Sequence, residues 1–217
     1  MDILIYMMHN LDLIASRTVE HIALVGVAIG LAILTGVPIG IAITQNRRVA
    51  NATLYVAAII MTIPSIAMFG IMIPILSKIG HGIGYVPAVI AVLLYSQLPI
   101  IRNTYTAINN VDPALREAAR GMGMTPLQRL AMVEIPLAIP VIMAGVRSAV
   151  VLSIGIMAIA AYIGAGGLGT FISQGISQTD PRQLVTGAVA LSLLAVCADS
   201  ALLWLQNRLT PTGLRCA

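Results

Sequence analysis

Five long hydrophobic stretches, separated by polar interruptions, dominate the pattern of this 217-residue chain. Each is about 20 residues or longer, the length that an α-helix needs to cross the hydrocarbon core of a bilayer. Backbone polar groups in lipid must pair within their own segment, so these stretches are predicted to be helices. The predicted spans are residues 21–44, 53–77, 86–108, 135–163 and 184–205. The predicted fold class is an all-α membrane protein with five transmembrane helices in one domain, residues 21–205.

Two polar segments flank the spans. In residues 1–20 the apolar positions recur at helical spacing from Ile3 to Ile14, but polar residues interrupt them and no basic region comes first. This pattern favours an amphipathic helix on the membrane surface over a signal peptide. Residues 206–217 form a short polar tail.

The lysines and arginines set the orientation, because cytoplasmic loops of membrane proteins carry an excess of them. With the N-terminus outside, nine of the 12 fall on the cytoplasmic side and three outside. We therefore expect a multi-pass protein of the cytoplasmic (inner) membrane, with residues 1–20 outside and the tail 206–217 in the cytoplasm. The cytoplasmic set is Arg47, Arg48, Arg102, Arg116, Arg120, Arg129, Arg208 and Arg215, with Arg147 near that face; the outer set is Arg17, Lys78 and Arg182.

The amino-acid composition limits the classes of protein to which this chain can belong. Hydrophobic residues make up 59% of the chain and charged residues 9%, whereas soluble domains carry about 25% charged residues. The net charge of +4 comes without a basic stripe, so we expect membrane lipid and no nucleic acid as partner. Cys197, Cys216 and the three histidines lack metal-ligand spacing, so no metal site is assigned. No catalytic motif is present, and we assign no catalytic residue.

The longest polar interruption, residues 109–136, contains two helix starts. Asp112 precedes Pro113, as an N-cap acid precedes a proline at the first helical position. Thr125 precedes Pro126, and Gln128 falls three residues after Thr125, as a capping box requires. Gly121 and Gly123 lie between the two and are predicted to end the first helix. The loop is thus a cytoplasmic elbow of two short helices, either a docking surface for another subunit or an ordinary structured loop.

The elbow also resembles a known family. Glu117-Ala118-Ala119, then Gly123, then Val133-Glu134-Ile135-Pro136 is similar to the EAA loop of binding-protein-dependent ABC importer permeases. The resemblance implies a type I ABC importer permease (MetI-like) architecture, in which the first short helix couples to an ATP-hydrolysing subunit. ATP and Mg would be bound by that subunit, and this chain would hold no cofactor. The other implied partners are a second, identical or homologous permease subunit and an extracytoplasmic substrate-binding protein. The implied ATPase-coupling residues are Glu117, Ala118, Ala119, Gly123, Thr125 and Pro126.

Three further segments indicate which branch of this family the chain resembles. Residues 62–74, 95–108 and 167–176 are similar to the osmoprotectant branch, whose members import glycine betaine, carnitine or choline. The implied function is the permease subunit of an ATP-driven importer for such quaternary-ammonium compounds. Methionine-type permeases share the EAA loop and the GAGGLG stretch, and an amino-acid permease of that type is the alternative. An alternative of another class is a membrane scaffold that recruits an ATPase without transporting.

Aromatic residues are few: one Trp, six Tyr and two Phe. Quaternary ammonium ions are commonly held by aromatic cages, so tight selection is expected in the external binding protein. The candidate residues of the substrate pathway are Pro64, Ser65, Tyr95, Gln97 and Tyr105. Helix kinking for the proline and interfacial anchoring for the tyrosines are the competing interpretations.

Two other features stand out. Asp199 lies inside the last hydrophobic stretch, where ionisable residues are functional suspects. Its distance from Arg208 places it near the cytoplasmic boundary, and we favour a structural partner for it. The glycine-rich run 164–169 fits neither a phosphate loop nor a dinucleotide fingerprint. It is either a tight turn into the outer loop or a contact near the outer gate or the binding protein.

Overall fold

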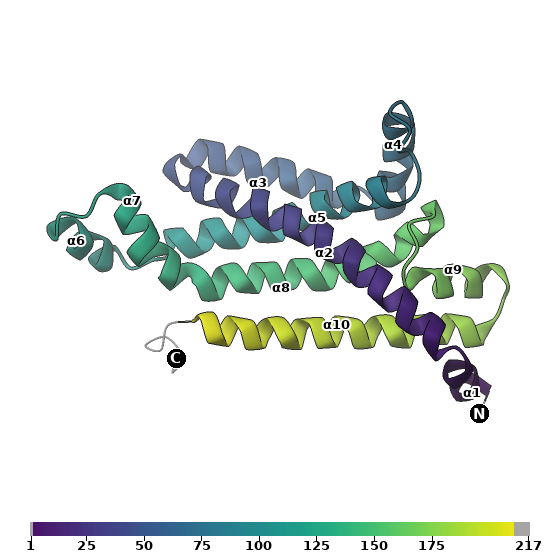
Figure 1. The fold of residues 1–217 in the computed structure, drawn as a ribbon. Coiled ribbons are helices and arrows are strands. Elements are labelled where there is room, and N and C mark those ends of the chain that lie inside the picture. The colour runs from purple at the N-terminus through teal and green to yellow at the C-terminus, as the bar shows by residue number, and fades with distance from the viewer. Residues whose placement is uncertain (1, 211–217) are drawn as a thin grey trace.

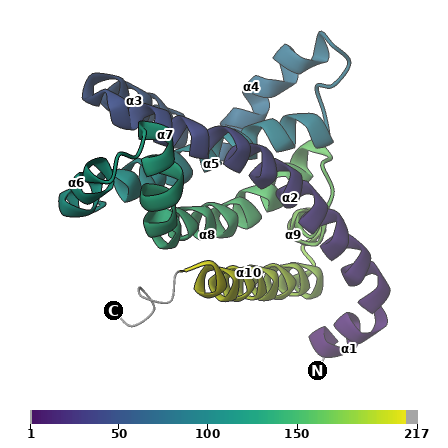
Figure 2. The same cartoon turned by 60° about the vertical axis from the view of Figure 1, so that its left-hand side comes forward.

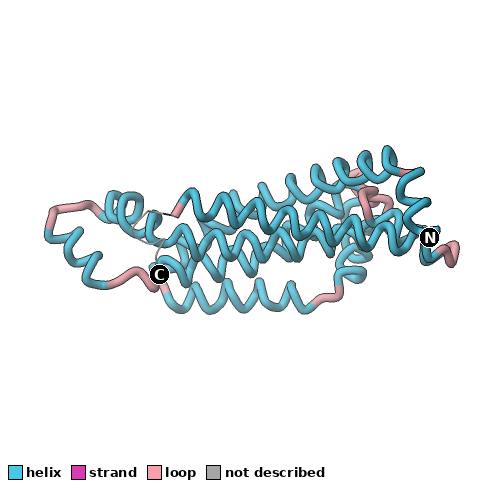
Figure 3. The backbone as a smooth tube through the Cα atoms, turned by 90° about the horizontal axis from the view of Figure 1, so that it is seen from below, coloured by secondary structure: helices cyan, strands magenta, loops and turns pink. Residues whose placement is uncertain are grey.

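A computed structural model describes residues 2–210, and within that range every regular element is helical (Figure 3). Four helical segments are long and apolar enough to cross a membrane: Leu11–Gln45, Tyr85–Asn109, Pro126–Ile163 and Pro181–Leu209. A bent pair of shorter helices supplies a fifth span if it is counted as one. The predicted all-α fold class is confirmed.

The elements run in the following order along the chain. The N-terminal half holds α1 (Asp2–His9), α2 (Leu11–Ala42), the 3₁₀ turn η1 (Ile43–Gln45), α3 (Arg47–Thr62), α4 (Ser65–Ser77) and α5 (Tyr85–Asn109). The C-terminal half holds α6 (Pro113–Gly121), α7 (Pro126–Arg129), the π-helical turn η2 (Leu130–Glu134), α8 (Ile135–Ile159), the 3₁₀ turn η3 (Ala160–Ile163), α9 (Gly169–Ser177) and α10 (Pro181–Leu209).

Helix α5 is the centre of the bundle and packs on both α2 and α8 (Figures 1 and 2). The contact surfaces are rich in small, fully buried residues, including Ala32 on α2, Ala88 and Ala91 on α5, and Ala149 on α8. Helices in lipid gain little from the hydrophobic effect, so close van der Waals packing between small side chains must hold them together. A hydrogen bond between the Ser96 and Ser153 hydroxyls, 2.9 Å long, adds a buried polar link from α5 to α8.

Two glycines let α5 come close to its neighbours. A Cβ on Gly40 of α2 would lie 2.6 Å from the Cβ of Thr104, and one on Gly145 of α8 would lie 2.5 Å from the Cβ of Asn103. Neither position has room for a larger residue without a shift of the helices.

The predicted span 53–77 is broken. Helices α3 and α4 meet at an angle of 98°, and α4 projects from the bundle (Figures 1 and 2). The cause is Pro64, because a residue before proline avoids the helical region: Ile63 and Pro64 are both extended, with ψ of 128° and 135°. The Tyr95 hydroxyl on α5 donates to the Ile63 carbonyl and so satisfies a backbone acceptor that the break exposes. Pro74 lies inside α4, which continues past it.

The N-terminal segment also differs in detail from the predicted surface helix 1–20. Only α1 is separate; residues from Leu11 onward are continuous with the first long helix. The bend falls at Asn10, whose side-chain amide donates to the Tyr6 carbonyl over 2.8 Å. The Arg182 guanidinium at the start of α10 lies 5.8 Å from the Tyr6 ring and holds α1 against that end of the bundle.

Helix α10 lies along one edge of the bundle (Figure 1) and packs on α8 and α9. It begins at Pro181, where the Asp180 carboxylate accepts from the Arg182 amide over 3.0 Å. No residue in its most apolar 18-residue window is buried within residues 2–210. A large apolar surface of α10 is therefore left for lipid or for another subunit.

The close approach at Gly145 gives a stability prediction. Gly145→Ala should destabilise the chain by about 1–3 kcal/mol, because the new methyl group overpacks the α5–α8 contact. Gly155→Ala on the same helix is the matched control, since a Cβ there has no atom within 4 Å. Thermal unfolding of the purified protein in detergent measures both, and an equal melting temperature for the two variants would contradict the assigned contact.

Candidate functional site

The candidate site is the elbow formed by α6, α7 and the turn η2, which extends beyond one end of the long helices (Figure 1). The C-terminal end of α10 lies at the same end of the molecule, whereas α1, α4 and α9 lie at the other. The elbow is thus a distinct structural unit at one face of the bundle.

Both predicted helix starts are confirmed. The Asp112 carboxylate caps α6 by accepting from the Ala114 amide over 2.8 Å, with Pro113 at the first helical position. At the start of α7, the Thr125 hydroxyl accepts from the Gln128 amide over 3.3 Å, and the Gln128 side chain accepts from the Thr125 amide over 2.9 Å. This reciprocal pair is a complete capping box.

The turn between the two helices depends on Gly123. Helix α6 ends at Gly121, and Gly123 has φ of +79°, in the left-handed region. The Met124 amide donates to the Ala119 carbonyl and the Gly123 amide to the Arg120 carbonyl, which is the bond pattern of a Schellman motif. Gly123 therefore reverses the chain at little conformational cost, as a residue with a Cβ would not.

A buried carboxylate joins the elbow to the bundle. Glu134 is only 6% exposed, and its Oε1 lies 2.9 Å from the Arg129 Nε on α7 and 3.2 Å from the Arg116 Nε on α6. Arg116 also donates to the Ile108 carbonyl near the end of α5. The cluster of Glu134, Arg116 and Arg129, which we call the elbow clamp, thus connects both short helices to α5 and to the base of α8.

The π-helical turn η2 positions Glu134. It interrupts the otherwise continuous segment Pro126–Ile163 and ends two residues before Pro136, whose ring nitrogen cannot donate the α-helical hydrogen bond to residue 132. Wider π turns of this kind are frequent at functional positions in helices.

The exposed surface of the elbow is mainly that of α6. Glu117 and Ala118 are exposed, whereas Ala119 is 1% exposed and faces into the chain. Thr125 and Pro126 are exposed at the start of α7. Ala118 is thus the alanine of the pair that leaves room for a close approach, and Ala119 serves the internal packing.

The elbow clamp was not predicted from the sequence. Arg116 and Arg129 entered the prediction only as evidence for orientation, and Glu134 only as part of a family pattern. One signal was available: acidic residues are scarce in this chain, and Glu134 stands two residues before a proline at the start of a long span.

The predicted pathway residues do not form one cluster. Pro64, Ser65 and Tyr95 meet at the break between α3 and α4. Gln97 lies elsewhere on α5, where its side-chain nitrogen is 3.0 Å from the Thr35 hydroxyl of α2 and its side-chain oxygen is buried without a partner in the described structure. Tyr105 packs near the other end of α5, against a small cluster of Ile43, Ala50 and Ile101 with Leu54.

The glycine-rich run 164–169 is a compact turn that packs against α2. Gly164, Gly166 and Gly167 all have positive φ, and the Glu20 carboxylate accepts from the Gly167 amide over 2.9 Å and from Arg17 over 2.8 Å. The neighbouring His21 is fully buried, with its Nε2 3.2 Å from the Ile154 carbonyl oxygen. The run therefore packs against the N-terminal half of α2.

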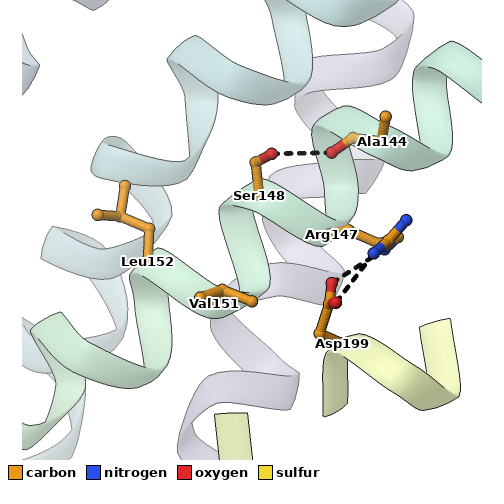
Figure 4. A pocket seen from close by; sticks show the side chains of 6 residues that line it. All are labelled: Ala144, Arg147, Ser148, Val151, Leu152 and Asp199. Atoms are coloured by element: carbon orange, nitrogen blue, oxygen red, sulfur yellow. Dashed lines mark hydrogen bonds and ion pairs between the residues drawn. The ribbon is translucent and has the colours of Figure 1, made fainter. Parts of the chain in front are cut away.

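Asp199 has the structural partner that was expected, and that partner is Arg147 (Figure 4). The Arg147 Nε and Nη2 each lie 2.9 Å from an oxygen of the carboxylate, so the pair is bidentate. Arg147 lies 12 residues beyond the start of α8, midway along that helix, and its side chain is partly exposed.

No group of three or more His, Cys, Asp or Glu residues could hold a metal ion in residues 2–210. The thiol of Cys197 is free and exposed on α10. Cys216 lies outside the described residues.

Comparison with known proteins identifies the family. The protein family described as "Binding-protein-dependent transport system inner membrane component" matches residues 29–211 of this chain. The chain is 55% identical to the osmoprotectant import permease protein OsmW of Salmonella typhimurium over 99% of its own length and 100% of that protein. It is 41% identical to the glycine betaine/carnitine/choline transport system permease protein OpuCB of Bacillus subtilis, covering 92% of this chain and 89% of that one.

The fold has a counterpart among solved structures. An inward-facing structure of the MetNI methionine ABC transporter superimposes with a TM-score of 0.82 at 26% identity, covering 93% of this chain and 98% of that one. This likeness confirms the MetI-like architecture that the elbow pattern implied. Together with the family match over most of its length, it establishes that this chain belongs to the inner-membrane components of binding-protein-dependent transport systems.

Proposed function

We propose that this chain is the transmembrane permease subunit of an ATP-driven importer for quaternary-ammonium osmoprotectants such as glycine betaine, carnitine or choline. The observation that carries this proposal is the 55% identity, over the whole chain, to a protein named as an osmoprotectant import permease. Other relatives at about 40% identity are named for choline, carnitine or glycine betaine transport.

The elbow is the proposed docking surface for a cytoplasmic ATPase subunit, which binds ATP and Mg in place of this chain. An exposed, capped helix with Glu117 and Ala118 on its surface offers a rigid contact that a neighbouring protein can push. A second permease subunit, identical or homologous, and an extracytoplasmic binding protein complete the importer. Closure of the ATPase then tilts the helices and alternates access between the two faces.

The proposed orientation places the elbow and the end of α10 in the cytoplasm and α1 outside. Arg47, Arg48 and Arg208 lie toward the elbow end of their helices, whereas Arg17, Lys78 and Arg182 lie toward the other end. The excess of arginine at the elbow end agrees with the positive-inside rule even without Arg147.

Transport measurements separate the proposed substrates from the alternative amino-acid substrate. Cells that lack other osmoprotectant importers and express the complete importer should take up radiolabelled glycine betaine, carnitine or choline, and excess methionine should not compete. Competition by methionine, with no uptake of any quaternary amine, would favour the methionine-type alternative. That alternative has support in the fold likeness to a methionine transporter.

Coupling through the elbow surface gives a second test of function. Glu117→Ala should abolish uptake and weaken co-purification with the ATPase, while membrane insertion survives, because Glu117 is exposed. Gly123→Ala should reduce uptake roughly fivefold, since a Cβ at this φ costs about 1 kcal/mol or more.

Gly121→Ala is the matched control for the turn, because Gly121 is helical and a Cβ there has no atom within 4 Å. Unchanged uptake in Glu117→Ala and Gly123→Ala would mean that the elbow does not transmit the work of the ATPase. It would then support a membrane scaffold that recruits an ATPase without transport.

The elbow clamp gives a third test. Glu134→Gln keeps the size of the side chain but removes the charge that pairs with Arg116 and Arg129. We expect the ATPase to remain bound and to hydrolyse ATP, while uptake per ATP falls roughly tenfold, the size of a typical coupling between sites. Loss of ATPase binding in Glu134→Gln to the same extent as in Glu117→Ala would show that the clamp shapes the surface but does not transmit motion.

A further inference from the structure

The ion pair of Arg147 and Asp199 borders a cavity of about 550 Å³ on the surface formed by α8 and α10 (Figure 4). Ala144, Ser148, Val151 and Leu152 of α8 form the rest of its lining. The pair is partly accessible, with 22% of the Arg147 side chain and 39% of the Asp199 side chain exposed. The cavity therefore presents both a positive and a negative group at its wall.

The pair lies well within two helices of membrane-spanning length, α8 and α10. Arg147 is 12 residues from the start of α8 at Ile135, and Asp199 is 10 residues from the end of α10 at Leu209. At about 1.5 Å of rise per residue, these distances are roughly 18 and 15 Å, so both residues lie well inside helices that are long and apolar enough to cross a membrane. Neither residue is positioned to serve as an interfacial anchor.

The position of the cavity on the bundle indicates what the ion pair faces. A separate, wholly apolar groove lined by Ile22, Ile29, Val150 and Ala198 lies between α2, α8 and α10. The cavity beside Arg147 and Asp199 lies on a different side of the α8–α10 contact. No residue of α2 lines that cavity. Charged groups within the membrane face protein or water and not lipid, so this side adjoins either a water-filled passage or another subunit.

The chemistry of the pair matches a small zwitterion. Arg147 donates three hydrogen bonds within the described structure, two to Asp199 and one of 3.2 Å to the Gln206 side chain. A guanidinium has five N–H groups, so two remain for the carboxylate of a ligand. A quaternary ammonium group donates no hydrogen bond and needs only proximity to the Asp199 carboxylate, so it can bind without breaking the ion pair.

We propose that Arg147 and Asp199 form a transient substrate site in the translocation pathway for zwitterionic quaternary-ammonium compounds, with the ligand carboxylate on Arg147 and the ammonium beside Asp199. This inference rests on the proposed function. Because the two residues already satisfy each other, a passing ligand gains little net binding energy. A weak site of this kind lets the ligand leave again, as a transport pathway requires.

The test compares a zwitterion with a cation of the same class. Glycine betaine carries a carboxylate and choline does not, so Arg147→Gln should lower glycine betaine uptake at least tenfold more than choline uptake in cells that express the complete importer. The ratio of the two rates is independent of how much importer reaches the membrane. Arg147→Lys keeps the charge and should keep the ratio within about threefold of the wild type, a difference below about 0.7 kcal/mol.

A second variant leaves the ion pair intact. Ser148→Asp places a negative charge in the cavity, which should repel the carboxylate of glycine betaine and lower the same ratio at least fivefold. Ser192→Asp is the matched control, because Ser192 of α10 is also exposed and also donates to the carbonyl four residues earlier but does not line the cavity. It should leave the ratio unchanged.

The outcomes separate the two proposals. If the wild-type importer takes up no quaternary amine, the proposed function fails and the site assignment fails with it. If the wild type transports but Arg147→Gln and Ser148→Asp change both substrates by the same factor, only the site assignment fails, and the pair is a structural link between α8 and α10. A selective loss of glycine betaine uptake in either variant supports the site.

Discussion

The contact between Glu134 and the two arginines Arg116 and Arg129 is what links the elbow to the helical bundle. Without it, α6 and α7 would keep their local caps but would lose their charged link to the bundle. With it, one carboxylate that is almost fully buried holds both helices to the base of α8, while Arg116 reaches the end of α5. Because α5 and α8 share the largest contact in the bundle, the elbow is linked through direct contacts to the centre of the fold.

The bilayer imposes the second constraint, which is that polar groups inside the bundle must find partners within it. The hydroxyl of Tyr95 on the Ile63 carbonyl, the Ser96–Ser153 bond and the Arg147–Asp199 pair all meet this requirement. Each also joins segments of the chain that are at least 32 positions apart in sequence. The few polar residues of the spans therefore determine which helix faces which, while the alanines and glycines determine how closely they approach.

The sequence predicted what depends on local chemistry. The spans follow from runs of apolar residues, and the starts of α6 and α7 follow from the capping residues Asp112, Thr125 and Gln128, whose bonds reach at most three positions along the chain. The sequence shows a proline at position 64 but does not predict a bend of 98° there. The geometry of the break is stabilised by Tyr95, 32 positions away from Ile63. The pairing of Arg147 with Asp199, the inward position of Ala119 and the elbow clamp likewise depend on contacts between separate helices, which a single sequence does not reveal.

The capping of the elbow has a thermodynamic consequence. Its turns are closed by hydrogen bonds between near neighbours, so its shape does not require another protein to be present. A segment that orders only upon binding loses part of its interaction energy to the entropy of that ordering. The elbow is preorganised and avoids this loss, so a protein that binds it can hold on through a modest interface of a few side chains. If another subunit docks here, as proposed, the elbow does not have to refold each time that contact forms.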